Sequence, residues 1–190
     1  MRSPRLMWLG VGVAVLVAFA GPGGAAAAGP WRATIVDAET GKPLEGVVVV
    51  AAFAKYTKGL AGLAGAEYYG SNEAVTGPDG RFEIPARNLW NPIRVFTVVR
   101  VEFTIVKPAY GHARWRVTAE QEERWRDLTL AELLEQPDIT MEMPVLKTRE
   151  ARWKYLTNWM VHSVVPLEAI PRFIEAENTE RAYLGLSPLR

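Results

Sequence analysis

The feature that most constrains the fold of this chain is a long alternation of apolar and polar residues between positions 93 and 105. Valine, threonine, phenylalanine and isoleucine occupy the odd positions from Ile93 to Ile105. The charged residues Arg94, Arg100 and Glu102 fall on even positions. A period of two over this length predicts a β-strand with one apolar face.

Other segments also have β character. The nearly continuous apolar run from Val47 to Ala54 predicts a strand that is covered on both sides or lies at the centre of a sandwich. Shorter β-prone runs occur at 31–36, 112–117 and 139–143. With 49% hydrophobic and 23% charged residues, 16 glycines and 13 prolines, the composition is that of a globular, turn-rich protein. We therefore expect a mainly β fold.

Two connections are predicted from their turn residues. The sequence Gly77-Pro78-Asp79-Gly80 separates β-prone residues 73–76 from 81–84, which predicts a tight hairpin. Residues 55–72 are predicted to form a long loop, because glycines are interleaved there with tyrosines and no regular period is visible.

Helical signals begin after position 117. Thr118 and Gln121 have the spacing of a capping box, so a helix is predicted to run as far as Glu135, although its polar first half could equally be a loop. Pro137 ends this stretch.

A second helical region follows Thr148. The apolar residues Trp153, Leu156, Met160 and Val164 lie three or four positions apart and predict one apolar stripe. Further helix starts are expected at Pro166 and Pro171, and Gly185 is a helix stop. This helical tail is expected to pack on the sandwich.

The first 28 residues resemble an export signal. Arg2 and Arg5 precede an apolar run from Leu6 to Ala20, and small residues follow. The run is shorter than the roughly 20 residues that a spanning helix needs. Cleavage is expected after Ala28, although Ala18-Phe19-Ala20 also satisfies the small-residue requirement and an uncleaved anchor is the alternative.

Three motifs together resemble a known family. Ile35 to Val49, with Thr40-Gly41-Lys42-Pro43-Leu44 at its centre, is similar to the opening signature of carboxypeptidase regulatory-like domains. Thr76 to Pro85 resembles the second signature of that family. Lys107 to Gly111 resembles its closing turn, and the three occur in the expected order.

The resemblance implies a seven-stranded, transthyretin-like (Greek-key) β-sandwich of the stand-alone exported bacterial type. The chain is expected to divide into a signal peptide at 1–28, the sandwich at 29–145 and a helical C-terminal extension at 146–190. No carboxypeptidase activity is implied, because the zinc site of those enzymes lies in a separate domain that this sequence does not contain.

The residue inventory disfavours catalysis and cofactors. Cysteine is absent, which excludes lipid attachment through cysteine, disulfides and thiolate chemistry. Of the 22 basic and 21 acidic residues, Arg2 and Arg5 belong to the signal, so the remainder carries a net charge near −1 and nothing suggests nucleic acid. The two histidines, His112 and His162, are too few for a metal site built from several imidazoles, and His162 with Ser163 is a poor dyad because neighbours on a helix do not face each other.

Acidic residues in turns were weighed as a calcium site. Asp37, Glu39 and Asp79 could converge at one end of a sandwich, but the alternating spacing of a calcium loop is missing. Asp is also a turn former without metal. We therefore predict no metal and no cofactor.

Aromatic residues at loops and strand ends are the candidates for ligand contact, because their faces can stack on sugars or peptide side chains. The competing interpretation is that Tyr68 and Tyr69 only pin the long loop against the sandwich. With the histidine that begins a strand, the candidate set is Tyr56, Tyr68, Tyr69, Trp90, Tyr110 and His112.

These observations predict a non-enzymatic binding or scaffold module in the periplasm or outside the cell. It would contact an envelope or extracellular protein or glycan through loops and a sheet edge, and a membrane only through an uncleaved signal. The alternative is a structural subunit of an envelope assembly that docks through its C-terminal helices. A hydrolase is the least favoured class.

Overall fold

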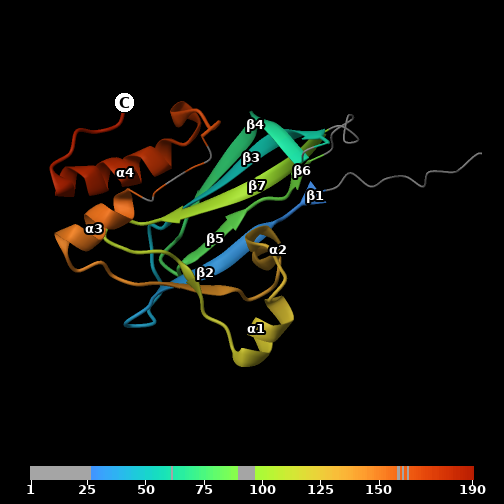
Figure 1. The fold of residues 1–190 in the computed structure, drawn as a ribbon. Helices are drawn as coiled ribbons and strands as arrows, with labels where there is room; N and C mark the ends of the chain where they lie inside the picture. The colour runs from blue at the N-terminus through green and yellow to red at the C-terminus, as the bar shows by residue number, and fades with distance from the viewer. Residues whose placement is uncertain (1–26, 61, 90–96, 158, 160, 162) are drawn as a thin grey trace, which may run out of the picture.

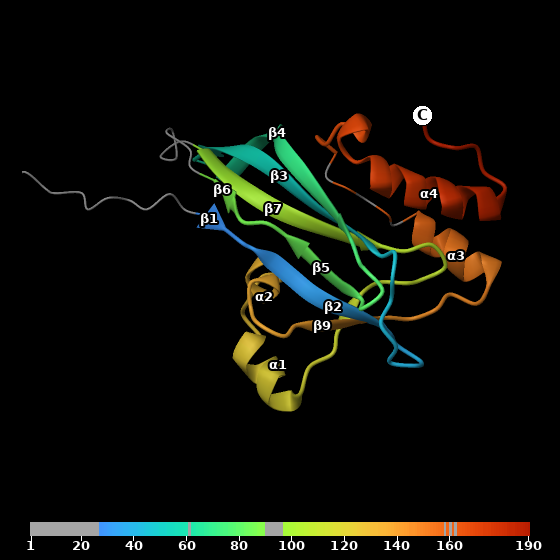
Figure 2. The same ribbon diagram turned by 180° about the vertical axis from the view of Figure 1, so that it is seen from behind.

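The structure is a computed structural model that describes residues 27–60, 62–89, 97–157, 159, 161 and 163–190. Within these ranges the protein is mainly β, as predicted. Two larger sheets pack face to face, and helices cover the outside (Figures 1 and 2).

The first large sheet has four strands in the order β5–β2–β9–β8. Its central strand β2 pairs antiparallel with β5 and parallel with β9, and β9 pairs antiparallel with β8. The bounds of these strands are Trp31–Asp37 for β2, Arg81–Ile84 for β5, Arg114–Trp115 for β8 and Thr140–Met143 for β9. Strands were predicted at all these places, although β8 is much shorter than the predicted 112–117.

The second large sheet has the order β4–β3–β7, and all its strands are antiparallel. Its strands are β3 (Val48–Gly59), β4 (Gly62–Val75) and β7 (Thr97–Val106). The predicted alternating strand is thus confirmed from Thr97 onward. Two short strands, β1 (Ala27–Ala28) and β6 (Arg87–Asn88), form a separate pair.

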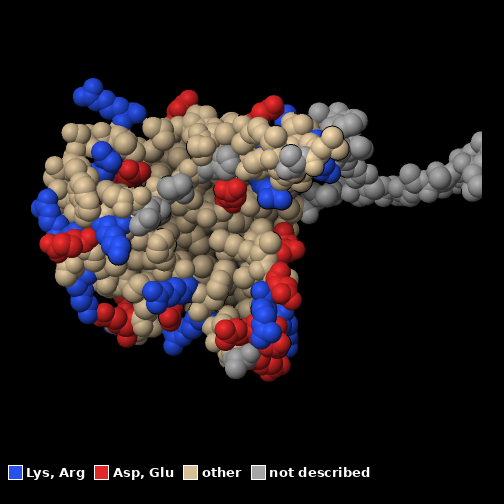
Figure 3. Space-filling model, in the orientation of Figure 1, with Lys and Arg blue, Asp and Glu red and all other residues tan. Residues whose placement is uncertain are grey.

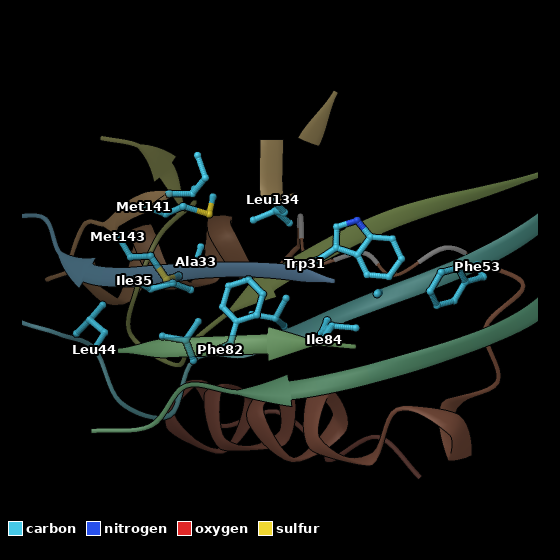
Figure 4. Close-up of a cluster of buried hydrophobic side chains, with 14 residues drawn as sticks. Trp31, Ala33, Ile35, Leu44, Phe53, Phe82, Ile84, Leu134, Met141 and Met143 are labelled. Atoms are coloured by element: carbon cyan, nitrogen blue, oxygen red, sulfur yellow. The ribbon is translucent and has the colours of Figure 1, made fainter. Parts of the chain in front are cut away.

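The main core lies between the two large sheets (Figure 4). Trp31 is fully buried, and its indole contacts the ring of Phe53 with centroids 5.8 Å apart and the ring of Phe103 with centroids 5.4 Å apart. Alternate residues of β2 and β5 face the same core, among them Ile35 and Phe82. Alternate residues of these strands thus face the core, although Val36 and Asp37 at the end of β2 are buried as well.

The predicted loop at 55–72 is wrong, because this stretch forms most of a long hairpin between β3 and β4. Gly59 and Gly62 form the last pair of this hairpin, and two further glycines lie at β-bulges. Gly65 and Gly70 have positive φ values of 58° and 143° and lie where the β3–β4 register shifts. A bulge keeps the strand paired while it bends and twists, so glycine here continues the sheet.

The predicted hairpin around Gly77–Gly80 is also wrong in its pairing. The turn itself forms, with the Gly80 amide donating to the Gly77 carbonyl at 2.9 Å. However, Arg81–Ile84 pairs with β2 in the opposite sheet, whereas β4 pairs with β3. The turn therefore carries the chain from one sheet to the other, because the alternating Phe82 and Ile84 fill the core from the far side.

The tail forms a third layer on the outer face of the β4–β3–β7 sheet (Figure 1). It contains α3 (Arg149–Leu156), a 3₁₀ turn at Leu167–Ala169 and α4 (Pro171–Leu184). Gly185 ends α4 in the left-handed conformation, with φ 74°, so the predicted start and stop of this helix are confirmed.

A second buried cluster joins the tail to the sheet. Val48, Val50 and Ala52 of β3 contact tail residues that include Trp159 and Phe173. The predicted packing of the tail on the sandwich is therefore confirmed.

The predicted stripe on the first tail helix is wrong in part. α3 ends at Leu156, and Trp153 is 47% exposed, while the buried face is formed by Tyr155 and Leu156. Val164 lies beyond the end of the helix, and Met160 lies outside the described residues. The helix ends early because the chain must turn to bring Trp159 onto the sheet.

The segment predicted to be a signal lies outside the described residues except for Ala27 and Ala28. These two residues form β1 and pair with β6, so cleavage after Ala28 would remove a short strand from this structure. None of the helices in the described ranges has the length and apolar character that crossing a bilayer requires.

Candidate functional site

The main core is open along one edge, where β7 and β8 lie at the margins of their sheets. The core-facing residues of β3, such as Val49 and Phe53, are fully buried, whereas Phe103 and Ile105 on β7 are only half-buried. β8 is two residues long and cannot cover the ten residues of β7. Apolar surface of the core therefore stays partly exposed at this edge.

Two short helices stand beside this open edge. α1 (Ala119–Trp125) begins at the predicted capping box, in which the Thr118 amide donates to Gln121 Oε1 at 2.9 Å. The predicted continuous helix to Glu135 is wrong, because a second capping box at Thr129 and Glu132 starts a new helix, α2 (Leu130–Leu134). There the Thr129 amide donates to Glu132 Oε2 at 2.8 Å.

The break between the helices sets their positions. α2 contacts β2 and β7 and places Leu134 fully inside the main core. α1 remains more exposed and carries Trp125 at its end. The two helices thereby form a wall across the open edge of the sandwich.

Between this wall and the strands lies an apolar cleft, which we call the edge cleft. It consists of two adjoining hollows that share Trp115, Leu128 and Leu133. The β7 hollow has a volume of about 310 Å³ and is lined by Phe103, Ile105, His112, Ala113, Trp115, Leu128, Leu130, Leu133 and Met141. The α1 hollow has a volume of about 300 Å³ and is lined by Trp115, Val117, Glu122, Trp125, Arg126, Leu128 and Leu133.

The edge cleft has few ionisable groups. His112 is the ionisable residue of the β7 hollow, and its ring packs edge-to-face on Tyr155 of α3, with centroids 4.4 Å apart. Burial raises the pKa of Tyr155 to about 12, so this phenol is neutral at physiological pH. In the α1 hollow, the guanidinium of Arg126 forms an ion pair with Glu123. Most of the side chains that line the cleft are thus apolar or aromatic.

Other hollows of about 310 Å³ have a different lining. One on the outer face of β2 and β5 is bordered by Arg32, Arg81, Glu83 and Asp138. Ligand sites are usually mostly apolar with a few polar groups. The lining of the edge cleft has fewer charged side chains than the lining of this hollow.

The predicted tyrosines of the 55–72 segment lie on the β3–β4 hairpin, on opposite faces. Tyr56 donates to Glu102 at 3.3 Å, and the hydroxyl of Tyr68 lies 2.9 Å from that of Ser71. Tyr69 packs against the main core instead, with the guanidinium of Arg87 5.6 Å from its ring centroid. Tyr56 and Tyr68 thus lie on the outer face of the hairpin and Tyr69 on its core-facing side, so the three do not form one binding surface.

The other predicted residues are also separated. Tyr110 donates to Asp37 Oδ2 at 3.3 Å, in the turn that follows β2. His112 lines the edge cleft. Trp90 and the second histidine, His162, lie outside the described residues. Among the described members of the predicted set, His112 is thus the residue that lines the edge cleft.

The acidic residues weighed as a calcium site have structural partners. Asp37 Oδ1 accepts from the amides of Glu39 and Thr40 at 2.9 and 2.7 Å, and Glu39 forms an ion pair with Lys147 at 2.7 Å. The amide of Thr40 is the main cause of a lowered pKa for Asp37. Across the described ranges, no group of three or more histidine or carboxylate side chains is placed to hold a metal ion.

Some residues of the edge cleft lie in motifs that are visible in the sequence, but nothing in the sequence shows that these motifs meet in one cleft. Trp115 lies in the β-prone run at 112–117, and the second capping box at Thr129 and Glu132 is visible as a motif. What brings Trp115 and Trp125 to one cleft is the break at 126–129. No known protein family, curated protein or solved structure matches this chain.

Proposed function

We propose that this chain is an exported, non-enzymatic binding module that holds an apolar segment of an envelope or extracellular protein in its edge cleft. The observation that carries this proposal is the cleft itself, where the main core remains half-covered between β7, β8 and the α1–α2 wall. Half-buried apolar surface of this kind is typical of ligand and protein contact sites.

We also propose that the sandwich is of the carboxypeptidase regulatory-like, transthyretin-like class. Its two larger sheets contain seven strands. Each of the three signature segments includes a turn between the sheets, namely from β2 to β3, from β4 to β5 and from β7 to β8. The proposal is supported because each signature lies where the chain passes from one sheet to the other. The proposed class includes a Greek-key order of the strands.

A binding role is favoured over catalysis by the lining of the cleft. His112 is an exposed residue of the β7 hollow that packs on the phenol of Tyr155, and the side chains lining this hollow include neither a nucleophile nor a carboxylate. General acid–base catalysis needs such a partner within hydrogen-bond reach. A protein segment is favoured over a glycan in the β7 hollow, where His112 is the one polar side chain among the described residues of the lining.

The alternative of a subunit that docks through its helices receives less support. Leu156 of α3 and Phe173 of α4 pack on the chain's own sheet, whereas Trp153 of α3 stays exposed. The export part of the proposal rests on Arg2, Arg5 and the apolar run that follows them.

The proposal can be tested by filling the β7 hollow. Ala113 is half-buried in its lining, so Ala113→Phe should occupy the space with little loss of core. A display library of short linear peptides would be selected on the wild-type protein and the binders measured on Ala113→Phe. We expect their affinity to fall at least about tenfold, which corresponds to roughly 1.4 kcal/mol.

The matched control is Ala64→Phe, which adds the same ring on the exposed part of β4. Both variants would be checked for an unchanged unfolding midpoint. Binders that tolerate Ala113→Phe as well as Ala64→Phe, or a selection that yields no binder, would contradict the proposal. A glycan array probed with the wild type and the same variants would show whether the cleft binds a glycan instead.

A further inference from the structure

The two hollows of the edge cleft differ in chemistry, which suggests what kind of segment they receive. The β7 hollow is apolar apart from His112. The α1 hollow is lined by two indoles, from Trp115 and Trp125, by the carboxylate of Glu122 and by Arg126, whose guanidinium is paired with Glu123. Indole faces attract cations, and the attraction increases where water is partly excluded.

The charge around the α1 hollow is negative. Residues 119–135 include the acidic residues Glu120, Glu122, Glu123, Asp127, Glu132 and Glu135 and the basic residues Arg124 and Arg126. Both arginines form ion pairs within α1 or at its end, Arg124 with Glu120 and Arg126 with Glu123. Figure 3 shows these acidic and basic side chains clustered around α1, at the lower edge of the molecule.

After this pairing, Glu122 is the acidic residue that lines the hollow, and it is exposed. Arg114 and Arg116, the nearest cations along the chain, flank Trp115 and alternate with it, so they point to the opposite face of β8. The α1 hollow therefore combines aromatic walls with the carboxylate of Glu122 and with Arg126, whose positive charge is offset by Glu123.

We propose that the α1 hollow receives the side chain of a lysine or arginine of the bound protein segment, while an apolar neighbour of that residue occupies the β7 hollow. This inference rests on the proposed function, because it specifies the partner of the same cleft. The cation would lie against the indoles of Trp115 and Trp125, and Glu122 would provide the countercharge. The long carbon stem of either basic residue suits an otherwise apolar lining.

The test compares two short peptides that differ in one charge. Acetyl-leucyl-glycyl-lysyl-amide and its norleucine counterpart would be titrated into the isotopically labelled protein, and the indole N–H signals of Trp115 and Trp125 followed. We expect the lysine peptide to bind about fivefold more tightly, as one exposed cation–π contact and a carboxylate would provide. The preference should weaken as salt is added.

Variants assign the preference to the α1 hollow. Glu122→Gln and Trp125→Leu should each reduce the preference for lysine to about twofold or less, because each removes one of the two attractions. Glu120→Gln is the matched control on the same helix, since its carboxylate pairs with Arg124, and the preference should survive there.

The outcomes separate the inference from the proposed function. If both peptides bind equally and Ala113→Phe abolishes both, the cleft binds apolar segments and the inference is wrong. A lysine preference that persists in Glu122→Gln and Trp125→Leu would also overturn the inference. If neither peptide shifts an indole signal and the library selection fails too, the inference falls together with the proposed function.

Discussion

At the scale of single residues, two glycines with the same backbone conformation illustrate how surroundings decide the importance of a position. Gly80 and Gly41 have φ values of 72° and 67°, a region that side chains disfavour. A Cβ atom on Gly80 would lie 2.5 Å from the Ile35 carbonyl oxygen, whereas the nearest atom to one on Gly41 is Arg116 Nη1 at 3.5 Å. Only Gly80 lies directly against the neighbouring main chain.

We therefore predict that Gly80→Ala destabilises the protein much more than Gly41→Ala. The left-handed conformation alone costs about 1–2 kcal/mol for alanine, and the close approach to β2 adds to this at Gly80. Denaturant unfolding of the two variants would measure the difference. Equal losses would show that the contact with Ile35 does not hold the turn in place.

A second residue-scale prediction concerns acid. Hydrogen bonds from Thr40, Glu39 and Tyr110 lower the pKa of Asp37 below its ordinary value of 3.8. A carboxyl whose pKa is lower in the folded state stabilises the fold above the unfolded pKa, and this stability is lost as the pH falls through the folded pKa.

Asp37→Asn should therefore unfold more readily than the wild type at neutral pH, and the difference should shrink below about pH 4. Thermal unfolding midpoints across this pH range would measure it. Tyr110→Phe removes one donor to Asp37, so it should reduce the pH dependence without abolishing it. Equal unfolding midpoints for the wild type and Asp37→Asn at neutral pH would contradict this explanation.

At the scale of elements, the tail is held by a buried ion pair as well as by apolar contacts. Glu180 on α4 is 2% exposed and accepts from Arg152 of α3 at Nε and Nη2, both at 2.6 Å. It also accepts from the amide of Ala109, in the turn after β7. The Arg152 guanidinium lies 3.4 Å from the ring centroid of Tyr183. One carboxylate thus joins both helices to the sandwich.

Glu180→Gln should loosen this junction by about 2–4 kcal/mol, because Arg152 would keep its charge in a poorly hydrated place. Glu177→Gln is the control on the same helix, because its 3.4 Å pair with Arg181 should contribute about 0.5 kcal/mol. Denaturant unfolding and hydrogen exchange at 149–184 would measure both variants. Similar losses in the two would mean that the Glu180 contact with Arg152 and Ala109 is not what anchors the tail.

At the scale of the whole molecule, the β4–β3–β7 sheet is a shared middle layer. Its inner face contributes Val49 and Phe53 to the main core, and its outer face contributes Val48 and Val50 to the cluster under the tail. This is the two-sided covering that the continuous apolar run predicted. The division into a sandwich and a C-terminal extension at residue 145 remains a prediction. Apolar residues of the two parts nevertheless bury each other.

Truncation after Val145 should therefore leave an apolar sheet face open to water and produce an aggregating or loosely packed chain. Soluble yield and near-ultraviolet circular dichroism would measure the loss. A truncated protein that stays monomeric and unfolds cooperatively would show that the sandwich folds without its tail.

The sequence by itself determined the local structure of this protein. Side-chain period and turn residues act over a few positions, so β2, β3, β7 and β9 could be predicted, as could the start and stop of α4. The same local rules failed at 55–72, where glycine was interpreted as a loop residue although Gly65 and Gly70 form bulges in a paired strand.

The tertiary structure alone decided which distant segments meet. Arg81–Ile84 pairs with β2 because its apolar face fills the core from that side, although the turn before it equally permits pairing with β4. The edge cleft arises in the same way, from a short β8, a half-covered β7 and a break between two helices. These contacts join residues far apart in the chain. Local sequence patterns do not determine which of several possible pairings between such segments forms.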